Sequence, residues 1–540
     1  MSCYWIVECF PISITSLLPV FLFPIFGIMK AKEVSKIYFH DNVMFIFSSL
    51  IIGLGIETTG LHEKLALRIC MSVGSEPKWI LLGIMSATGF LSVWISNTAT
   101  ASMILPIVVS LVKQLVILDP DFQEQVEING QKVSSIEMNS FESSATLKDL
   151  KDEDIRIELK EEISKIQDDD EDVFRTKNAK NLIKAFCLSI TYAATIGGTG
   201  SLIGTSSNIV FKGFFETRHP EDAMNFFTFM LYSIPISFIL IVVCWVVLCL
   251  VWFPKGKFIG VSSREGGSTS ISKIIRDKYE NLGPYTWEQK SIGFWFILVV
   301  TLWITRDLYF VPGWGVLFKK DYITDTSSAI LVLILICAWP KDNPFTSDTY
   351  EPLMTWKKIE KLFPWSLIFL IGGSLAMAEG CEKSGLSLWF GDFLEKVLPK
   401  QKVLLFIVIT VFSVFGTEFI SNISMASIML PILDSLAETY GYSYYYVLLP
   451  QAIAVNFSYM FPAAAPSNAV VFAGGYLTLT DMIKTGIILK LFAFIVLFLA
   501  SHTWLELIFK IPDIPTINNS TTLITTTEFI TEIIANSTYV

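Results

Sequence analysis

One stretch of sixteen residues occurs twice in this chain and constrains its fold more than any other feature. Residues 96–111 read SNTATASMILPIVVSL, and residues 421–436, 325 positions later, read SNISMASIMLPILDSL. Nine of the sixteen positions are identical, and Ser92 and Thr417 place a hydroxyl four residues upstream of each copy. A polar start followed by an apolar run, repeated at one register, predicts that the two halves of the chain fold alike.

Long runs without charge place both copies in a membrane. The chain is 52% hydrophobic and only 17% charged, against about 25% charged in a typical soluble domain. Residues 238–253 and 491–500 carry no charged side chain, as the middle of a bilayer-spanning helix requires. The sequence predicts an all-α polytopic membrane protein with about 11 transmembrane helices, the first of them truncated.

The residue inventory argues against several other classes of protein. The eight cysteines are scattered without a CxxC pair and the four histidines are dispersed, so neither a disulfide framework nor a zinc site is predicted. Much of the net charge of −10 lies in one acidic loop, and no nucleic-acid partner is expected. No His/Asp or Cys/His constellation is expected near the membrane midplane. We therefore predict no catalytic residues, no enzyme and no cofactor.

A second pair of motifs interrupts two other apolar runs. Residues 193–211, AATIGGTGSLIGTSSNIVF, contain four glycines and several hydroxyls. Their end matches PSNAVVF at 466–472, with Asn208 opposite Asn468 at an offset of 260. The acidic loop, which only the first half contains, accounts for the smaller offset. Each half is therefore predicted to hold a re-entrant hairpin with a Ser-Asn tip and a helix broken in its middle.

The basic loop and the glycosylation sequons set the orientation of the repeats. The positive-inside rule places the basic loop in the cytoplasm, and the sequons at Asn518, Asn519 and Asn536 place the C-terminal tail outside. The two halves then have opposite topology, as in secondary transporters. The predicted regions are 1–112 with the first hairpin, 113–180 as an acidic cytoplasmic loop, 181–253 with the first broken helix, 254–290 as a basic cytoplasmic loop, 291–508 as repeat two, and 509–540 as an extracellular glycosylated tail.

The chemistry of the Ser-Asn stretches suits ions. They offer hydroxyls, an amide and backbone groups freed by the break, and hard cations such as sodium take oxygen ligands. Helix N-termini present N–H groups to an anion, and neither stretch contains Lys or Arg. Binding of an anion would then depend on a co-bound cation. The alternative is that small polar residues only let membrane helices pack closely, but two copies at one register favour a binding site.

Three glutamates in or near apolar sequence, Glu57, Glu379 and Glu418, are further candidates, because ionisable groups at membrane depth are often functional. Glu57 and Glu379 fall close to predicted span ends, and a boundary position explains them equally well.

These motifs resemble the divalent anion:sodium symporters, solute carrier family thirteen, which includes sodium-coupled di- and tricarboxylate carriers, sulfate carriers and the insect INDY carriers. The resemblance spans nearly the whole chain. It implies a homodimer in which each protomer moves a transport domain against a scaffold in the manner of an elevator. The matching pieces are VWISNTATASMILPIV, YAATIGGTGSLIGTSSN, LIGGSLAMAEG, KYENLGP, FISNISMASIMLPI and FPAAAPSNAVVFAGGY.

The resemblance also implies a set of ligands, carried over by motif. The first sodium site would use Ser92, Ser96, Asn97, Gly197 and Gly198, and the second would use Thr417, Ser421, Asn422 and Ala464. The substrate carboxylates would contact Ser96, Asn97, Thr98, Thr199, Ser421, Asn422, Ile423 and Pro466.

Three departures from the family pattern bear on this expectation. Ala465 stands where the carboxylate carriers usually have Thr, and Ser467 stands where Pro is usual. The chain also begins two residues before a CYW motif that most of another helix precedes in the family, so a truncated first span is expected.

The expected function is sodium-coupled uptake of di- and tricarboxylates such as succinate and citrate across the plasma membrane. Three alternatives remain open. They are sodium-independent citrate or dicarboxylate exchange, sodium–sulfate cotransport, which Ala465 motivates, and a scaffold protein without transport, which the truncated span motivates.

Overall fold

The computed structural model describes most of the chain. The described residues are 11–71, 76–117, 177–219, 224–253, 279–308, 311–319, 322–346, 350–386 and 398–509, with a few single residues between them. The predicted glycosylation sites Asn518, Asn519 and Asn536 lie outside these ranges, as does most of the predicted acidic loop. Within the described ranges the regular elements are helices, and the β-pairing is an isolated bridge between Pro340 and Pro352.

The helices divide into two groups by their packing. The first group joins the N-terminal helices to the start of the second half, and α5 packs on α15 to α18. Its members are α2 (Ile12–Thr15), α3 (Leu18–Ile25), α4 (Ala31–Ile37), α5 (Asp41–Thr58), α15 (Trp287–Arg306), η4 (Trp314–Leu317), α16 (Asp325–Ala338), α17 (Trp356–Leu362) and α18 (Trp365–Lys383).

The second group contains both repeated stretches, and α11 packs on α7, α8 and α13. Its members are α6 (Leu61–Met71), which follows α5 but packs mainly on α7, together with α7 (Pro77–Ser92), α8 (Asn97–Ile117), α11 (Lys177–Gly198), α12 (Ser206–Arg218), α13 (Phe226–Trp252), α20 (Lys402–Gly416), α21 (Asn422–Tyr440), α22 (Tyr444–Ala454), η5 (Pro462–Ala464), α23 (Pro466–Ala473), α24 (Leu479–His502) and α25 (Trp504–Phe509).

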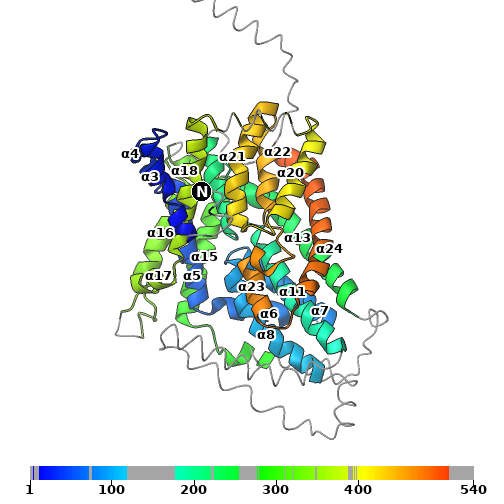
Figure 1. Ribbon diagram of the computed structural model, residues 1–540. Helices are drawn as coiled ribbons and strands as arrows, with labels where there is room; N and C mark the ends of the chain where they lie inside the picture. Colours follow the sequence, from blue (N-terminus) through cyan, green and yellow to red (C-terminus); the bar gives the residue numbers. More distant parts are fainter. Residues whose placement is uncertain are drawn as a thin grey trace, which may run out of the picture.

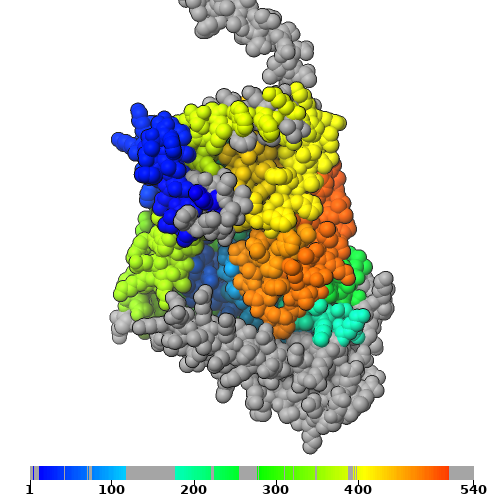
Figure 2. All heavy atoms as spheres, in the orientation of Figure 1, coloured from blue at the N-terminus to red at the C-terminus, as the bar shows by residue number. Residues whose placement is uncertain are grey.

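The two hairpins lie toward opposite ends of the molecule. In Figure 1, α7 and α8 lie low in the view, whereas α20 and α21 lie high. Figure 2 shows the division between the two groups at the surface, with the blue N-terminal helices on the left and the orange residues of α23 and α24 on the right.

Helix α12 connects the two groups. It packs on α5 and α18 of the first group and on α21 and α22 of the second. Its charged side chains make ion pairs across this contact. Lys212 Nζ lies 3.2 Å from Asp325 Oδ2 at the start of α16, and Arg218 pairs with Glu382 near the end of α18. The Lys212–Asp325 pair is buried, whereas Glu382 is about half exposed, so α12 contacts the first group through one buried and one partly exposed ion pair.

Local sequence sets where several helices begin and end. Asn225 and Thr478 cap α13 and α24 by accepting a hydrogen bond from the backbone N–H three residues later. Helix α21 ends at Tyr440 and is followed by Gly441, whose φ of +66° suits a residue without a Cβ. Polar caps thus define helices whose interiors are almost entirely apolar.

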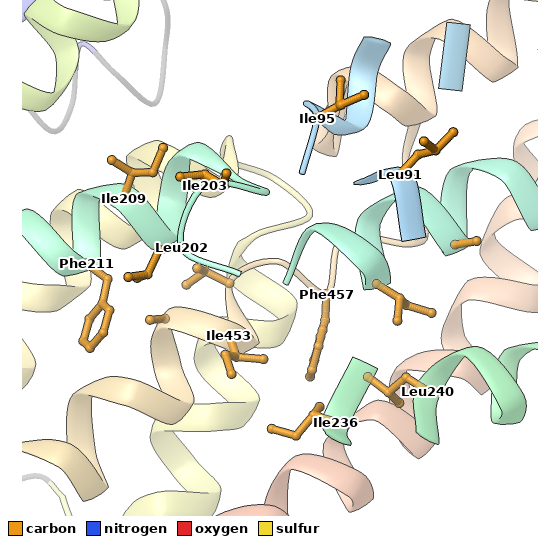
Figure 3. Packing of buried hydrophobic residues seen from close by; sticks show 14 of the residues in the cluster. Leu91, Ile95, Leu202, Ile203, Ile209, Phe211, Ile236, Leu240, Ile453 and Phe457 are labelled. Carbon is orange, nitrogen blue, oxygen red and sulfur yellow. The ribbon is translucent and has the colours of Figure 1, made fainter. Parts of the chain in front are cut away.

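Close backbone packing and a large apolar core hold the second group together. A Cβ added at Gly197 would overlap the backbone of Gly89, so α11 and α7 touch through their glycines. Figure 3 shows buried side chains from both broken helices, including Leu202 and Phe457, in one cluster with Ile236 of α13. Residues 199–205 and residues 455–459 of the two interruptions are therefore buried inside the protein.

Length and apolar composition identify only some of the expected membrane spans. In the described ranges, three segments are long and apolar enough to cross a bilayer, namely Asn97–Val116, Phe226–Trp252 and Leu479–Phe509. Two bent pairs, broken at angles of 72° and 65°, raise the number to at most five. The chain is a multi-pass helical membrane protein, and the count of about 11 spans stays a prediction, because interruptions divide the other segments into shorter helices.

Candidate functional site

A hydrogen bond between the same two matched positions closes each hairpin tip. Helix α7 ends at Ser92 and α8 begins at Asn97, while α20 ends one residue before Thr417 and α21 begins at Asn422. Ser92 Oγ lies 2.6 Å from a terminal atom of the Asn97 amide, and the hydroxyl of Thr417 donates to Asn422 Oδ1 at 2.7 Å. Each Ser-Asn pair thus sits at a turn between two helices, where the sequence predicts an interruption.

The serines that open the two stretches cap their own helices. Ser96 Oγ accepts a hydrogen bond from the backbone N–H of Ala99 at 3.3 Å, and Ser421 Oγ accepts one from Ser424 at the same distance. Both hydroxyls therefore orient the first turn of a helix. The remaining N–H groups of that turn are free of helical partners and can bind an anion.

The two broken helices are interrupted by unwound backbone. Helix α11 ends at Gly198 and α12 begins at Ser206, while α22 ends at Ala454 and α23 begins at Pro466. We call residues 199–205 the first break and residues 455–465 the second break. Backbone groups in these segments are free from regular helical bonding, so they need other partners or a ligand.

One asparagine braces each break in the same way. Asn208 Nδ2 donates to the carbonyls ten and seven residues upstream, at 3.4 and 2.8 Å. Asn468 Nδ2 donates to the carbonyls ten and seven residues upstream, at 3.0 Å each. The offset of 260 seen in the sequence therefore relates two equivalent structures.

Each tip meets the broken helix of its own half. In the first half, a Cβ added at Gly198 would collide with the amide of Asn97, so the glycine makes room for this contact. In the second half, Asn422 Nδ2 donates to Ser458 Oγ at 3.2 Å, and Ser458 occupies the position equivalent to Gly198. We call the two tip-and-break assemblies the first half-site and the second half-site.

Oxygen atoms converge on Asn97 in the first half-site. One terminal atom of its amide lies 2.6 Å from Ser92 Oγ, 3.1 Å from the Ala194 carbonyl oxygen and 3.3 Å from the Gly204 carbonyl oxygen. With the amide nitrogen in this place, Asn97 donates to both carbonyls. With the amide oxygen in this place, four oxygens face one another, which is the kind of ligand set that a hard cation takes.

The second half-site presents the same kinds of oxygen. Thr417 Oγ1 lies 2.7 Å from Asn422 Oδ1 and 2.5 Å from the Val455 carbonyl oxygen. Because the amide nitrogen of Asn422 is bonded to Ser458, its oxygen already faces this cluster. A hydroxyl, an asparagine amide and a backbone carbonyl of the broken helix thus meet in both half-sites.

Asn456 joins the two breaks. Its Oδ1 accepts hydrogen bonds from Thr205 Oγ1 at 2.9 Å and Ser207 Oγ at 2.5 Å. Its Nδ2 donates to Asn208 Oδ1 at 3.1 Å. In the reverse direction, Asn468 Oδ1 accepts from Thr191 of α11. The two half-sites therefore share one buried polar centre.

Some predicted ligands lie at the tips and breaks but are engaged elsewhere. Thr199 is buried, and its hydroxyl bonds to the Ile196 carbonyl at 2.6 Å and to Ser237 Oγ of α13 at 2.9 Å. Gly197 packs against the backbone of α7. In this structure, therefore, the Thr199 hydroxyl is directed to α13 and not to a tip.

The other predicted ligands occupy the first turns of helices or the second break. Ser96 is exposed, and Thr98 and Ile423 are half-buried at the two tips. Pro466 is exposed at the start of α23, and Ala464 is buried in η5. Within the described ranges, no group of three or more His, Cys, Asp and Glu side chains is placed to hold a metal ion.

Sequence reasoning singled out Glu418 only in passing and missed its partner, Lys490. Lys490 Nζ lies 2.6 Å from Glu418 Oε1. A lone lysine in the otherwise uncharged residues 485–500 was the available signal. Glu379, by contrast, pairs with Lys383 at 2.9 Å near the end of α18, and Glu57 lies in the last turn of α5, so both occupy boundary positions.

The fold and the paired half-sites define a class: multi-pass membrane proteins with a buried polar centre built from two equivalent halves. The family model described as "Sodium:sulfate symporter transmembrane region" matches residues 1–511. The chain therefore belongs to this symporter family, solute carrier family thirteen.

Individual relatives cover nearly the whole chain. The human Na(+)/dicarboxylate cotransporter 3 is 34% identical over 95% of this chain and 88% of its own length. The mouse solute carrier family 13 member 1 is 33% identical over 95% of this chain and 91% of its own. The rat Na(+)/citrate cotransporter is 33% identical, with the same two coverages of 95% and 91%. These proteins are transporters.

Proposed function

We propose that this chain is a sodium-coupled carrier of di- and tricarboxylates such as succinate and citrate, that it acts in the plasma membrane and that it is not an enzyme. One observation carries the proposal. In each half-site a tip hydroxyl, a tip asparagine and a carbonyl of a broken helix meet at hydrogen-bonding distances. The names of the dicarboxylate and citrate cotransporters among the relatives support the substrate class.

Each half-site would bind one sodium ion through neutral oxygens. The first would use Ser92, Ser96 and Asn97 with the backbone at Gly197 and Gly198. The second would use Thr417, Ser421 and Asn422 with the backbone at Ala464. These donors suit sodium because a hard cation binds hydroxyl, amide and carbonyl oxygens.

The substrate carboxylates would lie at the N-termini of α8, α21 and α23, whose N–H groups and positive dipole ends attract anions. The contacts would come from the Ser-Asn tips, Thr98, Ile423, Thr199 and Pro466. Because the tips contain no Lys or Arg, the bound sodium ions would supply the compensating charge. Coupling then follows by linkage, since each ligand raises the affinity of the other.

The two helix groups would move relative to each other during transport. The second group carries both half-sites, so it would act as the transport domain, and the first would act as the scaffold of a homodimer. Inverted repeats with about 11 spans would let the paired site face either side of the membrane in turn. If more sodium charge enters than the anion carries, the membrane potential adds about 2.3 kcal/mol per net charge per 100 mV.

Tracer uptake tests the proposal directly. Cells that express the chain are given labelled succinate, citrate or sulfate in sodium buffer and in choline buffer. Uptake of succinate or citrate that requires sodium is expected. Equal uptake in choline would contradict sodium coupling and favour the exchange mechanism.

Sodium–sulfate cotransport is the second candidate, and Ala465 favours it. This residue is buried at the position that caps α23, where it supplies no side-chain hydrogen bond. A hydroxyl contact to a carboxylate is therefore missing at this helix start. Sodium-dependent uptake of sulfate that succinate does not inhibit would establish this alternative.

A further inference from the structure

A buried ion pair adjoins the second half-site and has no counterpart in the first. Glu418 directly follows Thr417 in the turn between α20 and α21, and Lys490 lies within α24. Their side chains are each only 1% exposed, and the ammonium and carboxylate lie 2.6 Å apart. Two charges buried this deeply are costly unless they are paired and further hydrogen-bonded.

The carboxylate of Glu418 holds the N–H side of the second break. Glu418 Oε1 accepts hydrogen bonds from the backbone N–H groups of Tyr459 at 2.8 Å and Met460 at 3.0 Å, and Oε2 accepts one from Phe461 at 3.0 Å. Three consecutive N–H groups without helical partners thus meet one anion. Charge-assisted bonds of this kind are stronger than bonds between neutral groups.

Asparagine 468 holds the opposite side of the same segment. Asn468 Nδ2 donates to the carbonyls of Ser458 and Phe461, at the two ends of the segment whose N–H groups Glu418 binds. Ser458 is also the residue that binds the amide of Asn422 at the tip. The carboxylate therefore shapes the backbone on which the tip asparagine rests.

Lys490 ties this arrangement to the hairpin. Besides its contact with Glu418, its ammonium group donates to the Val414 carbonyl in the last turn of α20 at 2.5 Å. The lysine thus fixes the carboxylate from α24 and from the hairpin arm together. Without it, Glu418 would be an unpaired charge in the protein interior.

The first half-site uses neutral groups at the matching positions. Val93 stands where Glu418 stands in the second half, and it offers its backbone carbonyl to Ser201 Oγ at 2.5 Å. The N–H groups of Thr199 and Gly200 bond to carbonyls three residues upstream, at 3.2 and 2.9 Å. The first break therefore keeps a helical turn where the second break needs a carboxylate.

We propose that Glu418 and Lys490 are a positioning pair that pre-forms the second half-site by holding residues 458–461 in their unwound shape. Neither residue touches the tip oxygens, so the pair acts through the backbone. The inference rests on the proposed sodium coupling. Sodium affinity at the second half-site then depends on this pair, whereas sodium affinity at the first half-site is independent of it.

The test measures the sodium dependence of carboxylate uptake in three variants. The double variant Glu418→Gln/Lys490→Met removes both charges and avoids an unpaired one. Lys490→Arg keeps the ion pair, and Lys184→Met removes a different ion pair between α11 and α24, to Asp481 at 2.8 Å, that touches neither break. Surface biotinylation gives the amount of each protein in the membrane.

The double variant is expected to need about tenfold more sodium for half-maximal uptake, because several charge-assisted hydrogen bonds are lost. Maximal uptake per surface molecule should recover at high sodium. Lys490→Arg should stay within about threefold of the wild type and Lys184→Met should match it.

Two results would overturn the proposal. One is a double variant whose sodium half-saturation equals that of the wild type. The other is absence of both the double variant and Lys490→Arg from the cell surface, which would assign the pair to folding. If wild-type uptake is itself independent of sodium, the proposed function fails, and that result is distinct because it appears before any variant is made.

Discussion

The first and second half-sites reach the same polar geometry by different means. In the first, close packing without charge sets the shape: Gly197 touches Gly89, and Gly198 leaves room for Asn97. In the second, a buried carboxylate binds three backbone N–H groups and a lysine compensates its charge. Pseudosymmetric sites can thus share their ligand positions while their supports differ. Substitutions at matched positions should therefore have matched effects at the ligands and unequal effects at the supports.

The largest effect is expected at the tip asparagines. Asn97→Ala and Asn422→Ala should each abolish uptake while surface expression stays at the wild-type level, because each removes the amide that joins a tip to its break. Tracer uptake with biotinylation measures both quantities. Normal transport by either variant would contradict the proposal that the two half-sites are equivalent and that both are required.

Substitutions at the equivalent positions Gly198 and Ser458 should affect transport differently, because the two residues support the tip asparagines in different ways. Gly198→Ala forces a methyl group against Asn97, and this overpacking should reduce uptake by about tenfold or more at fixed sodium. Ser458→Ala removes one hydrogen bond to Asn422, so it should raise the sodium half-saturation by about two- to tenfold. A larger loss of uptake at fixed sodium for Ser458→Ala than for Gly198→Ala would contradict the expectation that the first half-site depends more on close packing.

The bracing asparagines should contribute similarly to stability. Asn208→Ala and Asn468→Ala each leave two carbonyls of a break without their donor, which should lower the melting temperature of the purified protein by about 2–10 °C. Asn343→Ala, in an exposed turn, is the control and should not change it. A shift confined to one of the two bracing positions would show that only one break depends on its asparagine.

The smallest effect is expected where only a methyl group changes. Thr417→Ser keeps the hydroxyl that contacts Asn422 and the Val455 carbonyl, so the sodium half-saturation should change less than about twofold. Thr417→Val removes the hydroxyl and should raise it by about tenfold. If Val is tolerated as well as Ser, the hydroxyl is not a ligand.

Much of this arrangement could be predicted from the sequence because it repeats. The offset of 325 located both tips, and the offset of 260 paired Asn208 with Asn468, whose hydrogen bonds match in the structure. Glycines and hydroxyls within apolar runs indicated the breaks, since a membrane helix tolerates such residues only inside protein or beside water.

The unmatched features could not be predicted in the same way. A repeat reports only what the halves share, so it gives no role to Glu418, whose matching position in the first half is Val93. Its partner Lys490 lies 72 residues away in another helix, and only the packing of α24 on α20 brings them together. The direction of the Thr199 hydroxyl toward Ser237 likewise depends on how α13 packs, which no local pattern encodes.

Asn456 has a consequence for how the two halves of this chain can change over generations. Its one side chain binds Thr205, Ser207 and Asn208, so it belongs to the second half but completes the first. A substitution of Asn456, or of the residues it binds, leaves buried polar groups of the other half without a hydrogen-bond partner. The sequences of the duplicated halves can therefore diverge at apolar surface positions. The residues that hydrogen-bond around Asn456 can only change together.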